Sequence, residues 1–184
     1  MKATGIVRRI DDLGRVVIPK EIRRTMRIRE GDPLEIYTDR EGEVIFKKYS
    51  PIGELTGFAA QYADTLHKIC SMAVIICDRD AVIASSGVSR KEYSDKRLSE
   101  ELEHIIEGRS LYLWSEGSPK LPAIYGGTHF VSCAMPIVSE GDIIGCVASL
   151  SDNEEDKPHD ALGGDVESKL IMTAAGFLGK QLES

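Results

Sequence analysis

Basic side chains gather at the amino-terminal end of a chain that is acidic overall. Residues 1–29 hold nine lysines and arginines against three acidic residues, although the 184-residue chain has a formal net charge of -7. Arginine dominates this group, and its planar guanidinium pairs with phosphate oxygens or a guanine edge through two hydrogen bonds. The side chains that could make such contacts belong to Arg8, Arg9, Arg15, Lys20, Arg23, Arg24 and Arg27. They predict binding of a polyanion such as duplex DNA, and the alternative is a basic face that meets only solvent.

The charge separates along the chain. Residues 1–50 hold 12 basic and 9 acidic residues, a net of +3, whereas residues 51–184 hold 11 and 21, a net of -10. The acidic part is expected to stay away from a polyanion and to lower non-specific binding to it.

Short strands, turns and one helix must position the basic residues. Gly14 can take the positive φ that a tight turn needs, and Pro19 suits the first position of a helix. Arg23 and Arg27, and likewise Lys20 and Arg24, are four residues apart and would share a helix face. The pattern predicts strands at 4–10 and 15–18, a helix at 19–27 and a hairpin of strands 34–38 and 43–48.

A break in regular structure is expected near Pro51 and Gly53, which divides the chain into domains 1–51 and 52–184. A unit of about 50 residues buries too little surface to be comfortably stable alone. It carries no cysteine for a disulfide, so the remaining remedy is oligomerisation. Two copies are therefore expected to share one core.

The segment GIVRRIDDLGRVVIPKEIRRTMRIREGDPLEIYTDREGEVIFKKYSP resembles the AbrB-type DNA-binding domain of transition-state regulators. The resemblance covers residues 3–51 almost without gaps. It implies an all-β swapped-hairpin barrel with one short helix, formed by an intertwined dimer. It also implies DNA contacts at the positions of Arg8, Arg15, Arg23 and Arg24. A divergent branch of the same barrel comprises antitoxins, which instead carry a disordered toxin-blocking tail.

The longer part of the chain shows an α+β pattern. Its order of elements resembles a GAF-like domain with an antiparallel sheet, and sporulation regulators are known that place such a domain after an AbrB-type one. Helical periodicity and apolar runs predict helices at 53–71, 92–107 and 164–183, and strands at 72–77, 81–84, 110–114, 130–137 and 143–150.

No catalytic, metal or cofactor site is predicted in the longer part. Ser85-Ser86-Gly87 could offer backbone N–H groups to an anion, although a plain loop is the simpler interpretation. The histidines His67, His104, His129 and His159 are scattered and are interpreted as structural or solvent-facing. Cys70, Cys77, Cys133 and Cys146 form no CxxC pair and are interpreted as reduced, mostly buried thiols. The enzymatic alternative is a GAF-type methionine sulfoxide reductase, which would need an exposed, activated thiol.

The resulting hypothesis is a sequence-specific transcriptional regulator, an activator or a repressor, of sporulation genes. Its expected partners are double-stranded DNA, a second copy through the amino-terminal domain, and further copies through apolar faces of the carboxy-terminal helices, giving a tetramer. A small-molecule effector of unknown type is a further expectation. The first residues lack the apolar core of a signal peptide and no run reaches the length of a membrane span, so a cytoplasmic location is expected, in the developing spore by resemblance.

Overall fold

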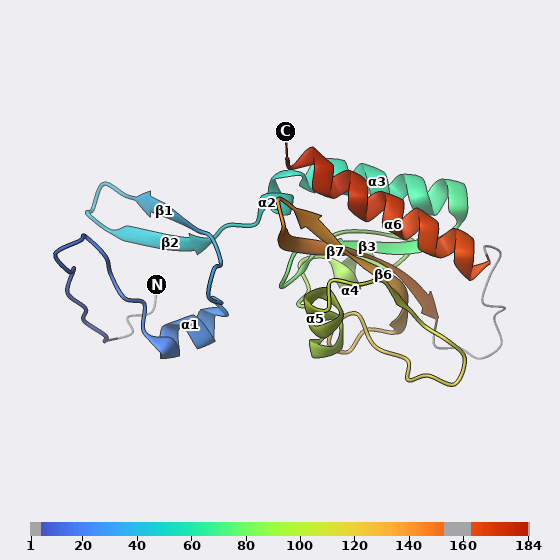
Figure 1. The fold of residues 1–184 in the computed structure, drawn as a ribbon, viewed down its shortest axis with the longest axis horizontal. Helices are drawn as coiled ribbons and strands as arrows, with labels where there is room; N and C mark the ends of the chain where they lie inside the picture. The colour runs from blue at the N-terminus through green and yellow to red at the C-terminus, as the bar shows by residue number, and fades with distance from the viewer. Residues whose placement is uncertain (1–4, 153–162, 184) are drawn as a thin grey trace. The chain divides into compact units, whose positions relative to one another are not determined.

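The polypeptide divides between Tyr49 and Ser50 in the computed structural model, which describes residues 5–152 and 163–183 (Figure 1). Each of the two units is built around its own sheet. The shorter has a two-stranded sheet and the longer a five-stranded one.

The amino-terminal unit consists of helix α1 (Lys20–Met26) and an antiparallel hairpin of β1 (Leu34–Thr38) and β2 (Val44–Lys48). Ile36 lies opposite Phe46 in this hairpin, so both side chains belong to one face. The helix and the hairpin were predicted from sequence, with ends within one residue of those observed.

The strands predicted at 4–10 and 15–18 are not formed within one chain. Thr4 lies outside the described residues, and residues 5–10 and 15–18 run without a paired strand. A strand exists only where another strand accepts and donates its backbone hydrogen bonds. The backbone hydrogen bonds within residues 5–18 are confined to the turn between Asp11 and Arg15.

A single amino-terminal unit has no buried core. None of residues 5–49 is buried, and large apolar side chains lie open to solvent. Val7 is 86% exposed and Ile36 is 62% exposed. The other exposed apolar side chains of this unit include Ile10, Leu13, Val17, Met26, Val44 and Phe46. One copy therefore does not bury the surface that normally stabilises a domain.

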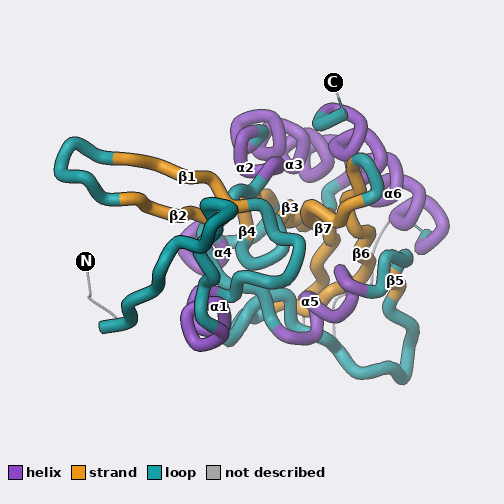
Figure 2. Tube along the Cα trace, turned by 60° about the vertical axis from the view of Figure 1, so that its left-hand side comes forward, coloured by secondary structure: helices purple, strands orange, loops and turns teal. Residues whose placement is uncertain are grey.

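The carboxy-terminal unit is an antiparallel sheet between two layers of helices (Figures 1 and 2). The order of strands in the sheet is β4-β3-β7-β6-β5. Helices α3 and α6 pack on one face, whereas α4 and α5 pack on the other. The strands are β3 (Ala73–Cys77), β4 (Val82–Ser86), β5 (Tyr112–Leu113), β6 (His129–Ser139) and β7 (Asp142–Asp152), and the helices are α2 (Pro51–Glu54), α3 (Thr56–Cys70), α4 (Arg90–Tyr93), α5 (Glu100–Glu107) and α6 (Gly164–Gln181). The predicted α+β class with an antiparallel sheet is confirmed.

Two apolar clusters lie on opposite faces of this sheet. Val74 and Ile76 of β3 pack towards α3 and α6, whereas Ile75 and Cys77 pack towards α4 and α5. This alternation follows from the period of two in a β-strand. Helix α6 approaches β6 so closely at Gly179 that an added Cβ would collide with the carbonyl oxygen of Val138.

Two of the predicted helices are interrupted. The helix predicted at 53–71 is divided at Leu55 into α2 and α3. The helix predicted at 92–107 is two helices, because residues 94–99 leave the helical conformation and Asp95 takes a positive φ of 55°. The hydroxyl of Ser99 then accepts a hydrogen bond from the Leu102 N–H at 3.1 Å and starts α5 as its N-cap.

Candidate nucleic-acid interface

A tight turn holds Arg15 in place. The Asp11 carboxylate accepts hydrogen bonds from the backbone N–H groups of Leu13 at 3.0 Å and Arg15 at 2.8 Å. It also accepts one from the Arg15 Nε at 2.8 Å. Gly14, with a φ of 76°, closes the turn by donating its N–H to the Asp11 carbonyl at 3.0 Å. Arg15 is therefore tied through Nε, while 69% of its side chain stays exposed.

The Asp11 carboxylate is the anchor of this turn, and sequence reasoning did not assign it a role. The hydrogen bonds from Arg15, from its backbone first and then from its side chain, hold the pKa of Asp11 below its usual value. The signal that could have revealed it is the spacing Asp11-Asp-Leu-Gly-Arg15, in which an acidic residue precedes a glycine turn and an arginine.

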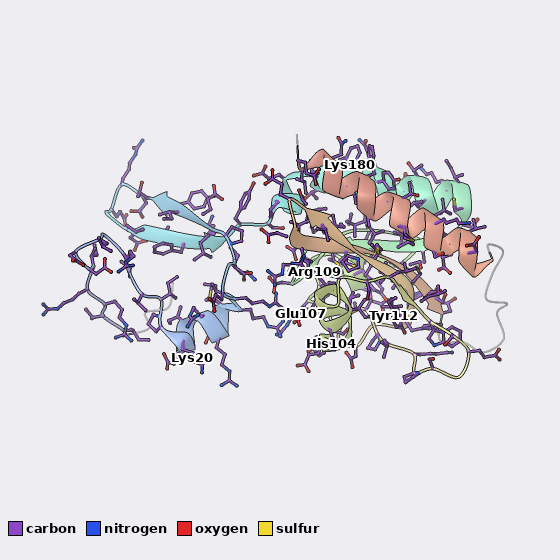
Figure 3. All side chains as sticks on the ribbon, viewed as in Figure 1. Lys20, His104, Glu107, Arg109, Tyr112 and Lys180 are labelled. Atoms are coloured by element: carbon purple, nitrogen blue, oxygen red, sulfur yellow. The ribbon has the colours of Figure 1, made fainter. Side chains whose placement is uncertain are left out.

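Helix α1 presents basic side chains to solvent. It begins after Pro19, and Lys20, Arg23 and Arg24 on it are exposed (Figure 3, which labels Lys20). None of these three side chains makes an ion pair with a carboxylate among residues 5–152 and 163–183. A cation without an internal counter-ion is available to an external anion.

Arg27 differs from its predicted neighbours. It is the C-cap of α1 with a φ of 53°, it is half-buried, and its carbonyl accepts a hydrogen bond from the Lys48 Nζ at 3.0 Å. Lys48 also lies 3.6 Å from the Asp32 carboxylate. Arg27 thus helps to join the end of α1 to the hairpin.

Arg8 and Arg9 lie on the extended segment that precedes the turn, and both are exposed. Six of the seven predicted side chains are therefore exposed on one small unit, three on the segment and turn before α1 and three on α1 itself.

The longer unit gives no anion site at the predicted loop. Ser85 and Ser86 belong to β4 and pair with Ile75 and Val74 of β3, so that segment is not the expected loop. An added Cβ at Gly87 would meet the His67 ring. The backbone here is used for sheet formation.

The described histidines have structural partners or face solvent. The His67 Nδ1 lies 2.9 Å from the Met72 carbonyl oxygen, and His104 is exposed on α5 (Figure 3). The His129 Nε2 lies 3.0 Å from the Asp152 carboxylate. His159 lies outside the described residues, and no three His, Cys, Asp or Glu side chains among the described ones could hold a metal.

Three cysteines are buried and one is half-buried. The pKa of Cys77 is well above its ordinary value because of its hydrogen bond with Cys146 and its burial. Burial, with the Glu167 carboxylate nearby, raises the pKa of Cys133 to about 12. These shifts favour the protonated thiol, which is a poor nucleophile.

None of the described helices is long and apolar enough to cross a membrane.

Comparisons with known proteins match both units. Residues 54–183 match the family described as stage V sporulation protein T C-terminal, transcription factor. Residues 7–53 match the family described as antidote-toxin recognition MazE, bacterial antitoxin.

Relatives with similar sequences exist for the whole chain and for the amino-terminal unit. Stage V sporulation protein T of Bacillus subtilis (strain 168) is 54% identical over 185 residues, which cover 100% of this chain and 99% of that protein. Transition state regulatory protein AbrB of the same strain is 65% identical over 51 residues, covering 28% of this chain and 52% of that protein. The solved structure of the GAF domain/HD domain protein from Geobacter sulfurreducens is 18% identical and covers 74% of this chain and 99% of that one, with a TM-score of 0.47.

Proposed function

This chain belongs to the family of stage V sporulation protein T, and on that premise we propose that it is a transcription factor that binds duplex DNA through its amino-terminal unit. The observation that carries the proposal is the 54% identity to the Bacillus subtilis protein along the full length of both chains. The DNA-binding domain spans residues 1–51, and residues 52–184 form a domain for oligomerisation and regulation.

Two copies form the DNA-binding head. The absence of any buried residue among 5–49 supports this, as do the apolar side chains that one copy leaves exposed. Residues 5–10 and 15–18 have strand-like sequence but no strand partner in one chain, and a second copy supplies that partner. The pair then buries a common core and repeats its basic side chains about a two-fold axis.

Six exposed basic residues of the head and the half-buried Arg27 contact DNA. Arg8, Arg15, Arg23 and Arg24 are the principal contacts, with Arg9, Lys20 and Arg27 as further ones. Asp11 holds Arg15 in a fixed orientation before DNA arrives, which lowers the entropic cost of binding. An Arg15→Ala or Arg23→Ala substitution is expected to cost about 1–3 kcal/mol of affinity where the side chain contacts a base.

Copies associate further through α3 and α6 into a tetramer. The rings of Phe58, Tyr62 and Phe177 form a cluster on these two helices, with centroids 5.8 to 6.3 Å apart. Phe177 is 42% exposed and Ile69 is 77% exposed, so the helix pair offers an apolar surface to another copy. The same domain receives a small-molecule effector.

The protein acts in the cytoplasm of the developing spore and is not an enzyme. The raised pKa values of Cys77 and Cys133 count against a thiol-based methionine sulfoxide reductase. The antitoxin alternative is disfavoured because residues 54–183 match a transcription factor family and not a toxin-blocking tail.

Genome-wide mapping of the sites bound in sporulating cells tests the proposal. We expect discrete sites upstream of sporulation genes, each of which the purified full-length chain retards in a gel shift. A chain that occupies no discrete site in cells and retards none of the candidate duplexes at low salt would contradict it.

A further inference from the structure

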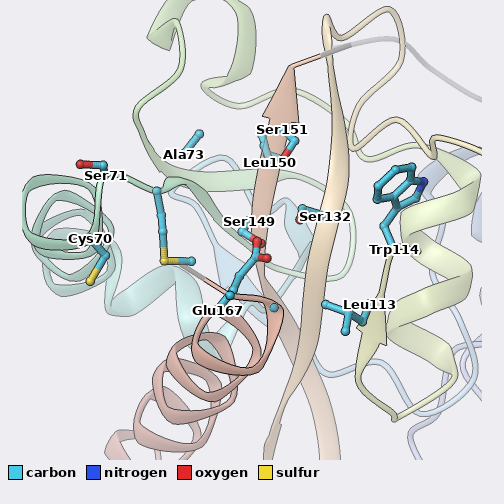
Figure 4. A pocket seen from close by; sticks show the side chains of 13 residues that line it. Cys70, Ser71, Ala73, Leu113, Trp114, Ser132, Ser149, Leu150, Ser151 and Glu167 are labelled. Atoms are coloured by element: carbon cyan, nitrogen blue, oxygen red, sulfur yellow. The ribbon is translucent and has the colours of Figure 1, made fainter. Parts of the chain in front are cut away.

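A cavity of ≈ 500 Å³ opens on the sheet face that carries α3 and α6, beside the first turn of α6 (Figure 4). Its volume is in the range of small-molecule sites. The residues whose side chains define its chemistry are Met72, Leu113, Trp114, Ser132, Ser149 and Glu167. The cavity lies wholly within the carboxy-terminal unit.

Glu167 supplies the charge of the cavity. One of its carboxylate oxygens accepts a hydrogen bond from the Ser149 Oγ at 2.6 Å, and the side chain is half-buried. Figure 4 shows Glu167 reaching from α6 towards Ser149 on the sheet. No lysine, arginine or histidine among residues 5–152 and 163–183 pairs with it. A partly buried carboxylate usually has a counter-ion, because burial removes the water that solvates it.

The remaining lining residues favour the same kind of ligand. Among the 13 described residues that line the cavity, Glu167 is the one charged residue and none is basic. A phosphate or carboxylate ligand would meet repulsion and find no basic partner. Ser132 offers a hydroxyl group, whereas the Ser149 hydroxyl is already bonded to Glu167 and to the Cys133 backbone N–H. Met72, Leu113 and Trp114 offer apolar surface.

We propose that this cavity binds a small organic cation, with an ammonium group on Glu167 and a hydrocarbon body against Met72, Leu113 and Trp114. This inference rests on the proposed function in one respect: it names the binding site and the chemical class of the small-molecule effector proposed above. The cavity is also lined by the end of α3, at Cys70 and Ser71, and by the start of α6, at Gly164. A bound cation therefore contacts both of the helices through which copies are proposed to associate.

Trp114 lines the cavity and is the one tryptophan of the chain, so its fluorescence serves as the signal for binding. The full-length protein is titrated at constant ionic strength with four compounds of one five-carbon skeleton: cadaverine, 5-amino-1-pentanol, 1,5-pentanediol and glutarate. We expect saturable changes in emission with the two ammonium compounds and none with the neutral diol or the dianion. The same ammonium compounds are expected to slow alkylation of Cys70, the half-buried thiol that lines the cavity.

Two variants on α6 distinguish binding in the cavity from a general effect of negative charge on the protein surface. Glu167→Gln keeps an oxygen for the Ser149 hydrogen bond but removes the charge, and it should weaken binding of 5-amino-1-pentanol by about tenfold or more. Asp165→Asn removes an exposed carboxylate that pairs with Lys169 at 2.7 Å outside the cavity, and it should leave binding unchanged. Ser132→Ala is a second cavity variant that keeps the charge, and it should weaken binding less than Glu167→Gln.

Three results would overturn the inference: no response to either ammonium compound, an equal response to 1,5-pentanediol, or unchanged binding in Glu167→Gln. None of these measurements involves DNA. A chain that bound no cation but still bound its operators would leave the proposed function intact, and the reverse outcome would leave the cavity site intact.

Discussion

Replacing Ile36 with alanine tests whether a second copy covers the apolar face of the β1–β2 hairpin. The substitution removes three carbon groups, which are worth about 2.4 kcal/mol when the side chain is fully buried. One chain leaves 62% of Ile36 exposed. Burial of that fraction by a second copy contributes about 1.5 kcal/mol per chain, or about 3 kcal/mol per pair. The pairing equilibrium should therefore weaken by about a hundredfold.

Hydrogen exchange in the full-length chain measures this effect. If pairing closes the hairpin, amide protection in β1 and β2 should fall by about a hundredfold in Ile36→Ala. Tyr37→Ala is the comparison, because Tyr37 is the next residue of β1 and points to the opposite face. It removes a similar preference for strand conformation and the contacts of Tyr37 with Lys47 and Glu35 within the same chain, but it leaves the shared core unchanged, so amide protection in this variant should fall by less than about tenfold.

Similar small effects of the two substitutions would refute the shared core. Exposed side chains that contact nothing usually change stability by no more than about 0.5 kcal/mol. In that case the hairpin face would be a solvent-exposed surface, and the stability of the amino-terminal unit would need another source.

Three further outcomes follow from the carboxy-terminal unit. Gly179→Ala should destabilise this unit by about 1–3 kcal/mol in chemical unfolding, because the added Cβ collides with Val138. Gly176→Ala is the control, since no atom lies within 4 Å of an added Cβ there, and it should be neutral or stabilising by up to about 1 kcal/mol. The reverse order of stabilities would contradict the close approach of α6 to β6. Burial raises the pKa of Tyr93 from 10.0 to about 12, so the phenol ionises at lower pH in the unfolded chain than in the folded one. The free energy of unfolding should therefore fall as pH rises from 10 to about 12, and Tyr93→Phe should lessen that fall. An unchanged pH profile in Tyr93→Phe would argue against the burial of Tyr93. In mass-spectrometric alkylation of the native protein Cys70 should react first, and faster labelling of any buried cysteine would count against the packing.

Most elements of the fold could be predicted because their periodicity is strong. Leu34 and Ile36 alternate with Glu35 in the first hairpin strand, and α6 has a long helical pattern between clear ends. The split between α4 and α5 was missed because residues 94–99 have mostly polar side chains that suit an exposed helix face. Their conformation is set by tertiary contacts, such as the bridge from Leu98 to Ile124, which local pattern does not reveal.

The sequence predicted the exposure of most basic side chains of the candidate site, but not the role of Asp11. Exposure of the basic side chains follows from their charge, and six of the seven predicted residues are exposed. Arg27 is half-buried because its position at the end of α1 brings it against the hairpin, where Lys48 donates to its carbonyl. Asp11 was not foreseen, since its role depends on a turn geometry that places one carboxylate against three donors.

The salt dependence of operator binding by the full-length chain tests the central proposal most directly. Removing one cation that neutralises a DNA phosphate should flatten the slope of log affinity against log salt by about 0.9. Because the head holds two copies of each residue, Arg23→Gln and Arg24→Gln should each flatten the slope by about 1.8. Lys68→Gln should leave the slope unchanged, because Lys68 belongs to the carboxy-terminal unit and pairs there with Asp64 at 2.6 Å. Equal slopes for all three variants and the parent chain would contradict the proposal that α1 contacts the DNA backbone.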